Sequence, residues 1–267
     1  MYTAGIDLGS ATGKAVIMRD GEVIGQQVLP SQARPQEMAQ RVLEGALSGA
    51  ALSSVDQISN VIATGYGRLN LEIASENISE ISCHAKGAHW MIPGVRTIID
   101  IGGQDCKVIS LNPDGSVDDF TMNDRCAAGT GRFFEGVARG LGSSLEGISA
   151  VENQGEKPCN ITNQCSVFAE SEVITLINEG NAFENIIAGV NISVARRIRG
   201  MARKVGVAED VVMTGGCSKN LGLAKAIGDL MKVELKTCPM DPQLAGAIGA
   251  ALFAHERLQK KGNEDAA

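Results

Sequence analysis

The chain has 267 residues, of which 44% are hydrophobic and 21% are charged, and its formal net charge at pH 7 is −7. This composition is typical of a globular protein with a sizeable core, and the acidic balance argues against nucleic acid or an anionic membrane as the main partner. No apolar run reaches the roughly 20 residues that a membrane-spanning helix needs, and no basic segment precedes the first predicted strand. We therefore expect a cytoplasmic protein that binds neither nucleic acid nor membrane.

The N-terminal segment predicts a strand, a loop of small residues and a second strand, and Asp20-Gly21 then predicts a hairpin turn into a third strand. Small residues let backbone N–H groups face a phosphate, and hydroxyl and ammonium groups can add contacts. A plain β-meander would show the same signals, so this segment alone does not decide between the two. The candidates for nucleotide binding are Gly9, Ser10, Ala11, Thr12, Gly13 and Lys14.

The same unit recurs later in the chain. Residues 98–109 align with residues 5–16 without a gap, which places Asp100 on Asp7 and Lys107 on Lys14. A recurring unit of this kind predicts duplicated subdomains that face each other. A carboxylate at each first-strand end can hold a hydrated Mg²⁺ and, with the loops, bracket the phosphates of a nucleotide. The candidates in this group are Asp7, Asp100 and Gln104 for catalysis, the last to orient the attacking water, and Gly102 and Gly103 for binding.

The remaining segments alternate between predicted helices and strands. We expect a helix from Pro35 to about Ala51, a strand at 61–63 and a packed helix or connector over 78–90. Near the C-terminus, a buried strand at 211–213 leads through a glycine pair into a helix, an arrangement that lets the adenosine part of a nucleotide lie against backbone. The candidates here are Gly215, Gly216, Asn220 and Gln243. We divide the chain into subdomain I, residues 1–95 with helix 245–260 packed back on it, and subdomain II, residues 96–244.

Seven cysteines and no C-x-x-C pair make a complete zinc site within one chain improbable. Cys126 lies in a glycine-rich loop before an apolar helical face, and Cys165 lies just ahead of a second predicted helix, for which Ser166 is the candidate N-cap. Helix N-termini favour thiolates, although the first segment taken alone favours a tight loop with one buried cysteine. A longer helix follows, with an apolar stripe from Ile186 to Val205 and an arginine-rich face that we expect to be solvated.

These motifs resemble a known protein superfamily and, within it, one family. The Asp7 hairpin, its repeat at Asp100 and the Gly215-Gly216 turn resemble the nucleotide motifs of the acetate kinase/sugar kinase/Hsp70/actin ATPase superfamily. Within it, residues 122–133 and 165–174 resemble the iron–sulfur activators of 2-hydroxyacyl-CoA dehydratases and the ATPase subunits of benzoyl-CoA reductases. The resemblance implies an α/β fold of two duplicated ribonuclease H-like subdomains around a nucleotide cleft.

The resemblance also implies an activity. ATP, bound with Mg²⁺, would be hydrolysed to ADP to deliver one low-potential electron from ferredoxin or flavodoxin to a dehydratase or reductase component, in an oxygen-sensitive protein of anaerobic metabolism. Cys126 and Cys165 of two subunits would hold one bridging [4Fe–4S] cluster in a homodimer, in agreement with the four thiolates that such a cluster takes. Cys159 is expected to be a bystander. The alternative is a sugar or acyl kinase on the same fold, with the cysteines merely buried.

Overall fold

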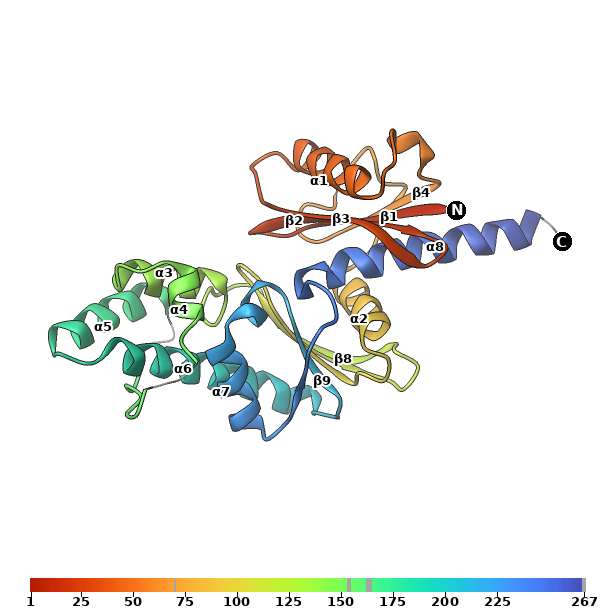
Figure 1. The fold of residues 1–267 in the computed structure, drawn as a ribbon. Coiled ribbons are helices and arrows are strands. Elements are labelled where there is room, and N and C mark those ends of the chain that lie inside the picture. The colour runs from red at the N-terminus through yellow and green to blue at the C-terminus, as the bar shows by residue number, and fades with distance from the viewer. Residues whose placement is uncertain (70, 153–154, 162–164, 266–267) are drawn as a thin grey trace. The chain divides into compact units, whose positions relative to one another are not determined.

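The computed structural model describes residues 1–69, 71–152, 155–161 and 165–265, and the chain forms two compact α/β units (Figure 1). Unit 1 contains residues 1–94, residues 111–117 and the chain from Cys238 onward, and unit 2 contains residues 95–110 and 118–237. Because the chain returns to unit 1 at its end, residues that are far apart in the sequence build that unit together.

Unit 1 is built on a five-stranded sheet in the order β3-β2-β1-β4-β5. Its first three strands are antiparallel neighbours, and β4 and β5 run parallel to β1. Asp20 and Gly21 connect β2 to β3 with φ values of 52° and 89°, as a two-residue hairpin turn requires. The strands are β1 (Tyr2–Leu8), β2 (Thr12–Arg19), β3 (Glu22–Pro30), β4 (Asn60–Thr64) and β5 (Glu76–Asn77).

Helices cover both faces of this sheet. Ala15 and Ile17 of β2 pack with residues of α1, and the alternate residues Val16 and Met18 pack with residues of α8 such as Ile248. Burial on both faces explains why β2 reads as a continuous apolar run rather than an alternating one. The helices are α1 (Pro35–Gly49), α2 (Glu80–Met91) and α8 (Ala245–Asp265), with short 3₁₀ turns η1 (Val55–Gln57) and η3 (Pro242–Leu244).

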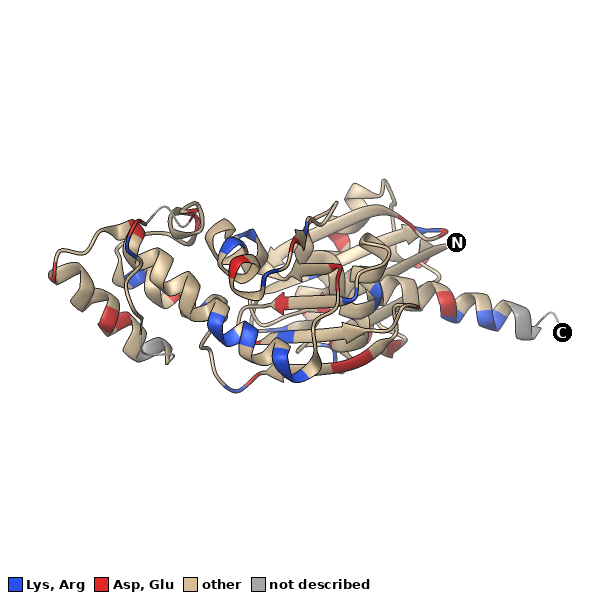
Figure 2. Ribbon diagram, turned by 90° about the horizontal axis from the view of Figure 1, so that it is seen from below, with Lys and Arg blue, Asp and Glu red and all other residues tan. Residues whose placement is uncertain are grey.

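Helix α8 makes backbone contact with its neighbours in unit 1. A Cβ atom at Gly5 of β1 would collide with the Ala247 carbonyl oxygen, and one at Gly87 of α2 would collide with that of Ala245. Only glycine permits such an approach. The charged positions of α8 accordingly lie in its part near the C-terminus, away from these contacts (Figure 2). The helix continues to Asp265, beyond the expected end at residue 260.

Unit 2 repeats the design of unit 1. Its sheet has the order β8-β7-β6-β9-β10, in which β6 and β7 are antiparallel and β9 runs parallel to both β6 and β10. This is the strand order of unit 1 with each strand replaced by its counterpart, so the predicted duplicated α/β architecture is confirmed. The strands are β6 (Thr97–Ile101), β7 (Cys106–Leu111), β8 (Val117–Asn123), β9 (Val211–Thr214) and β10 (Leu235–Lys236).

The helices of unit 2 share one large apolar core with the sheet. Phe133 and Phe134 pack edge to face at 5.9 Å between ring centroids, and the apolar stripe of α6 is buried as predicted. None of the helices in the described part of the chain is long and apolar enough to cross a bilayer. The helices are α3 (Gly131–Gly140), α4 (Leu145–Ser149), α5 (Ser166–Asn178), α6 (Phe183–Val205) and α7 (Leu221–Met231), with a 3₁₀ turn η2 (Gly216–Lys219).

Candidate functional site

Asp7 lies at the end of β1, paired with a lysine of the next strand. It is 3% exposed, and Lys14, which faces it directly across β1 and β2, donates a hydrogen bond from Nζ to Asp7 Oδ2 at 3.1 Å. Gly65 closes the other side with φ +86°, and a Cβ there would collide with Asp7 Oδ1. The carboxylate is therefore held between an ammonium group and a backbone turn.

The loop between β1 and β2 is tied down by its own backbone. The Gly9 N–H donates to the Thr12 carbonyl at 3.0 Å, and the Ser31 hydroxyl donates to the Gly9 carbonyl at 2.7 Å. Ser10 and Ala11 remain partly exposed at its tip, as a loop that receives a ligand requires. Gly13 is buried, and a Cβ on it would lie 2.7 Å from the Met38 Cε of α1.

Gln243 reaches this loop from the far end of the chain. It lies in η3, and its Nε2 donates to the Thr12 hydroxyl oxygen at 3.4 Å. Both residues belong to unit 1. The structure thus brings two of the predicted nucleotide-binding residues together.

Asp100, the counterpart of Asp7 in unit 2, is in contact with both a lysine and a threonine. Lys107 donates from Nζ to Asp100 Oδ2 at 3.1 Å and also forms an ion pair with Asp105. The Thr214 hydroxyl donates to Asp100 Oδ1 at 2.9 Å. Asp100 and Lys107 are each 2% exposed, so these charges depend on one another for stabilisation.

Gly102 and Gly103 follow β6 in a bend that contacts the start of α3. The Gly102 N–H donates to the Asp105 carbonyl at 2.9 Å, and the Gly102 carbonyl accepts the N–H of Gly131 at 2.9 Å. Gln104 is exposed beside them, where a side chain can reach a bound ligand or water.

Gly215 begins the third predicted motif. Its φ is +79°, and a Cβ there would lie 2.8 Å from Asp100 Oδ1, so a glycine is required beside the carboxylate. Gly216 is exposed. Asn220 has a structural role, because its Oδ1 accepts the Leu223 N–H at 3.0 Å as the N-cap of α7 while its Nδ2 donates to Asn191 Oδ1 at 3.1 Å.

Sequence reasoning missed the counterpart of this motif in unit 1. Thr64 pairs with Asp7 in the parallel register of β4 and β1, as Thr214 pairs with Asp100 in that of β9 and β6. Gly65 then lies against Asp7 as Gly215 lies against Asp100. The shared Thr-Gly after a short buried strand was the signal that could have revealed it.

Two of the seven cysteines are exposed, and they are the two predicted cluster ligands, Cys126 and Cys165. The others are partly or fully buried. Burial raises the pKa of Cys83 and of Cys217 to about 12 and that of Cys238 to about 11, which disfavours the thiolate that a metal takes. Burial also raises the pKa of Cys106 and of Cys159.

The two exposed cysteines relate to their helices in different ways. Cys165 is the N-cap of α5 and Ser166 is the first helical residue, so the expected N-cap at Ser166 is wrong. Cys126 lies in a loop that reaches α3 only at Gly131. In that loop, Asn123 Nδ2 donates to the Cys126 carbonyl at 2.7 Å, and the Thr130 hydroxyl donates to the Ala127 carbonyl at 2.7 Å. Helices α3 and α5 pack against each other.

Arg197 of α6 packs against the loop that contains Cys126 and Gly129. It is partly buried, and its Cδ lies 3.0 Å from the position of a Cβ on Gly129, whose φ is +79°. The expectation of a fully solvated arginine face on α6 is therefore wrong at this residue. The side chain folds against the loop because glycine leaves room for it.

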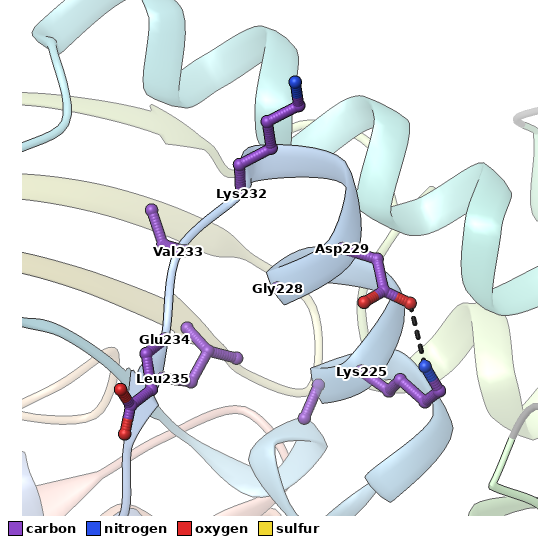
Figure 3. Close-up of a pocket in the computed structure, with 8 residues that line it drawn as sticks. Lys225, Gly228, Asp229, Lys232, Val233, Glu234 and Leu235 are labelled. Atoms are coloured by element: carbon purple, nitrogen blue, oxygen red, sulfur yellow. Dashed lines mark hydrogen bonds and ion pairs between the residues drawn. The ribbon is translucent and has the colours of Figure 1, made fainter.

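Within the described residues, no group of three or more His, Cys, Asp or Glu side chains could hold a metal ion. A separate hollow of about 570 Å³ lies between α7 and β10 (Figure 3). Lys225 and Asp229, paired at 2.9 Å, line one side of it, and none of the predicted site residues belongs to it.

Comparison with known proteins places this chain in a family. The model of the BadF/BadG/BcrA/BcrD ATPase family matches residues 4–254. The chain belongs to this ATPase family. It is 48% identical over 261 residues to the activator of lactoyl-CoA dehydratase from Anaerotignum propionicum, with 98% of this chain and 100% of the relative covered.

Solved structures agree with the family assignment. The activator of 2-hydroxyisocaproyl-CoA dehydratase from Clostridium difficile with bound ADPNP has a TM-score of 0.93 and 39% identity, covering 99% of this chain and 98% of that one. A ROK family glucokinase from Streptomyces griseus has a TM-score of 0.58 and 12% identity over 96% of this chain and 100% of its own. The likeness to the glucokinase shows a shared fold alone. This member of the BadF/BadG/BcrA/BcrD ATPase family therefore has the predicted sugar kinase-like fold.

Proposed function

We propose that the chain is an ATP-dependent activator that delivers one low-potential electron to a 2-hydroxyacyl-CoA dehydratase or to a related reductase component. The observation that carries this proposal is the exposure of Cys126 and Cys165 alone among seven cysteines, in a chain of this ATPase family. Two relatives that are similar over nearly their whole length are named activators of such dehydratases.

The two Asp–Lys pairs support the nucleotide part of the proposal. In each unit the carboxylate, Asp7 or Asp100, would contact a hydrated Mg²⁺, and the lysine that lies against it, Lys14 or Lys107, would help to balance the phosphate charge. Gln104, exposed at its bend, would orient the attacking water. ADPNP in the structure of a relative supports ATP as the nucleotide.

Loop backbone and small side chains would supply most of the remaining nucleotide contacts. Within unit 2, phosphates would meet N–H groups of the loop that follows Asp100, and adenosine would lie along the Gly215-Gly216 turn. The loop that follows Asp7 is the corresponding phosphate-binding candidate of unit 1. Gln243 would hold Thr12 in place from the side. Asn220 would act through the cap of α7 rather than by touching the ligand.

The donor set fits an iron–sulfur cluster shared between two chains. Cys126 and Cys165 supply two exposed thiols, and the described residues offer no third ligand beside them. A [4Fe–4S] cluster takes four thiolates, so a homodimer would supply them. When bound, the cluster supplies one-electron transfer. Cys165, as the N-cap of α5, would place the positive helix end next to the anionic cluster.

The partners and location follow from this chemistry. Ferredoxin or flavodoxin would be the electron donor, and the dehydratase or reductase component the acceptor. A cytoplasmic location belongs to the same proposal, since the seven cysteines form no disulfide and suit a reducing compartment.

Iron, sulfide and EPR analysis of strictly anaerobic protein tests the proposal. We expect about four irons per dimer in the wild type, their loss in Cys126→Ala and their retention in Cys238→Ala, a matched substitution at a thiol of raised pKa. Reconstituted wild type without iron would refute the cluster. Phosphorylation of a hexose by that iron-free protein would instead favour the kinase alternative.

A further inference from the structure

The glycine loop that follows β6 is hydrogen-bonded directly to the helix that follows Cys126. The N–H of Gly131 donates to the Gly102 carbonyl and the N–H of Arg132 donates to the Gly103 carbonyl, each at 2.9 Å. Gly131 and Arg132 are the first two residues of α3. The first N–H groups of a helix have no partner inside it, so α3 takes these two partners from the loop.

Gly131 makes this contact possible because it has no side chain. A Cβ at this position would lie 3.2 Å from the Gly103 Cα and 3.3 Å from the Gly102 carbonyl oxygen. Both distances are shorter than ordinary van der Waals contacts, so a methyl group would push the loop and the helix apart by a few tenths of an ångström.

The loop is also held from its other sides. The N–H of Gly102 donates to the Asp105 carbonyl at 2.9 Å, and the Cys217 Sγ lies 3.9 Å from the Gly102 carbonyl oxygen as a weak donor. Residues of both η2 and α3 therefore contact the Gly102 carbonyl oxygen, and a shift of this carbonyl would change both contacts.

The contact continues from α3 to Cys126. Thr130, the fully buried N-cap residue, donates to the Ala127 carbonyl from its hydroxyl at 2.7 Å and from its N–H at 3.1 Å. Asn123 Nδ2 donates to the carbonyl of the preceding residue, Cys126, at 2.7 Å. Short hydrogen bonds thus link the glycine loop to the exposed cysteine, all within unit 2.

We propose that Gly131 is a positioning residue that couples nucleotide binding at Gly102 and Gly103 to the conformation of the Cys126 loop. The inference rests on the proposed function, because it takes the phosphates to bind at these glycines. The Gly102 and Gly103 carbonyls share their peptide planes with the N–H groups of Gly103 and Gln104, so they turn when those N–H groups turn toward a phosphate. Helix α3 then follows through its two N–H groups, and the Cys126 loop follows α3.

The alkylation rate of Cys126 in iron-free protein tests this coupling without any cluster. Iodoacetamide labelling is followed at each cysteine by peptide mass spectrometry, with and without Mg-ADP or Mg-ADPNP, and nucleotide affinity is measured on the same samples by calorimetry. We expect saturating nucleotide to change the Cys126 rate of the wild type about fivefold or more, a common size for coupling between two sites. In Gly131→Ala we expect nucleotide still to bind and the ratio of rates to fall towards one.

Gly140→Ala is the matched control. It is the same substitution in the same helix, but its Cβ would meet atoms of Glu170 and Ile174 only at ordinary contact distances of 3.4 Å or more. A merely structural effect would lower the melting temperature without changing the ratio of rates. We expect Gly140→Ala to keep the wild-type ratio.

Different outcomes separate this inference from the proposed function. Nucleotide that binds the wild type without changing the Cys126 rate, or Gly131→Ala with an unchanged ratio, would overturn the coupling and leave the proposed activity intact. Absence of nucleotide binding would overturn both. If Gly131→Ala does not fold, hydrogen exchange of the Gly131 and Arg132 amides in the wild type decides: we expect nucleotide to change it, and unchanged exchange refutes the coupling.

Discussion

Lys107 meets Asp100 across β6 and β7 in the register and at the distance, 3.1 Å, with which Lys14 meets Asp7 across β1 and β2. The two pairs are therefore the same structural device in the two units. In each, an ammonium group neutralises a buried carboxylate at a strand end. Such a pair places a cation next to a buried carboxylate at a site where phosphate and Mg²⁺ are expected.

Removing the charge of Lys107 should destabilise unit 2 strongly. In Lys107→Met, the carboxylates of Asp100 and Asp105 lose their buried partner, and breaking such a pair costs about 3–5 kcal/mol. Urea unfolding of the variant measures this loss. Lys225→Met is the control, because the Lys225–Asp229 pair is exposed and contributes little. Similar stability of the two variants would contradict the assigned role of Lys107.

Gly215→Ala should cost more than backbone strain alone. Gly215 has φ 79° and ψ 175°, a conformation that is essentially restricted to glycine and costs another residue about 1–3 kcal/mol. The methyl group would also collide with the Ile101 carbonyl oxygen and lie 2.8 Å from Asp100 Oδ1. Gly206→Ala separates strain from contact, since Gly206 has φ 82° and ψ 159° with open space around it. We expect similar strain in both, and a further loss of stability and of nucleotide affinity only in Gly215→Ala. Equal losses in the two variants would show that the contacts with Ile101 and Asp100 have no effect.

Thiol labelling of iron-free native protein should be selective. At about pH 8, a thiol with a pKa of about 12 has roughly 1,000 times less thiolate than one with a pKa of 9. Cys126 and Cys165 are exposed to the reagent, so we expect them to be labelled first while Cys83 and Cys217 stay unlabelled. Denatured protein, in which all seven should react, is the control.

Stability should fall in alkaline solution. The pKa of Cys217 rises from 9.0 to about 12 in the folded chain because burial disfavours its thiolate. Above pH 9 the unfolded chain therefore binds fewer protons than the folded one, and the free energy of unfolding decreases as pH rises from about 9 towards 12. Denaturant unfolding at a series of pH values measures the slope. Cys217→Ser, which keeps a donor but does not ionise there, should show a shallower slope, and an unchanged slope would argue against this origin.

The sequence by itself determined the elements and their duplication. Alternating apolar residues, the Asp20-Gly21 turn and the repeat of Asp7 at Asp100 are local patterns, and local backbone preferences translate them directly into strands and hairpins. The two exposed cysteines were also identified by their neighbours in the chain. Wherever a residue's environment is made by nearby residues, the prediction from sequence was sufficient.

Only the tertiary structure decided which distant groups meet. The contact of Gln243 with Thr12, the place of Arg197 behind Gly129 and the position of Gly65 against Asp7 each join segments that are far apart in the chain. No local pattern encodes them, because they depend on how sheets and helices pack and on where glycine leaves room. The link from Gly102 to Gly131 is of the same kind, since it needs the helix start and the strand end to be brought within hydrogen-bonding distance by the common core of unit 2.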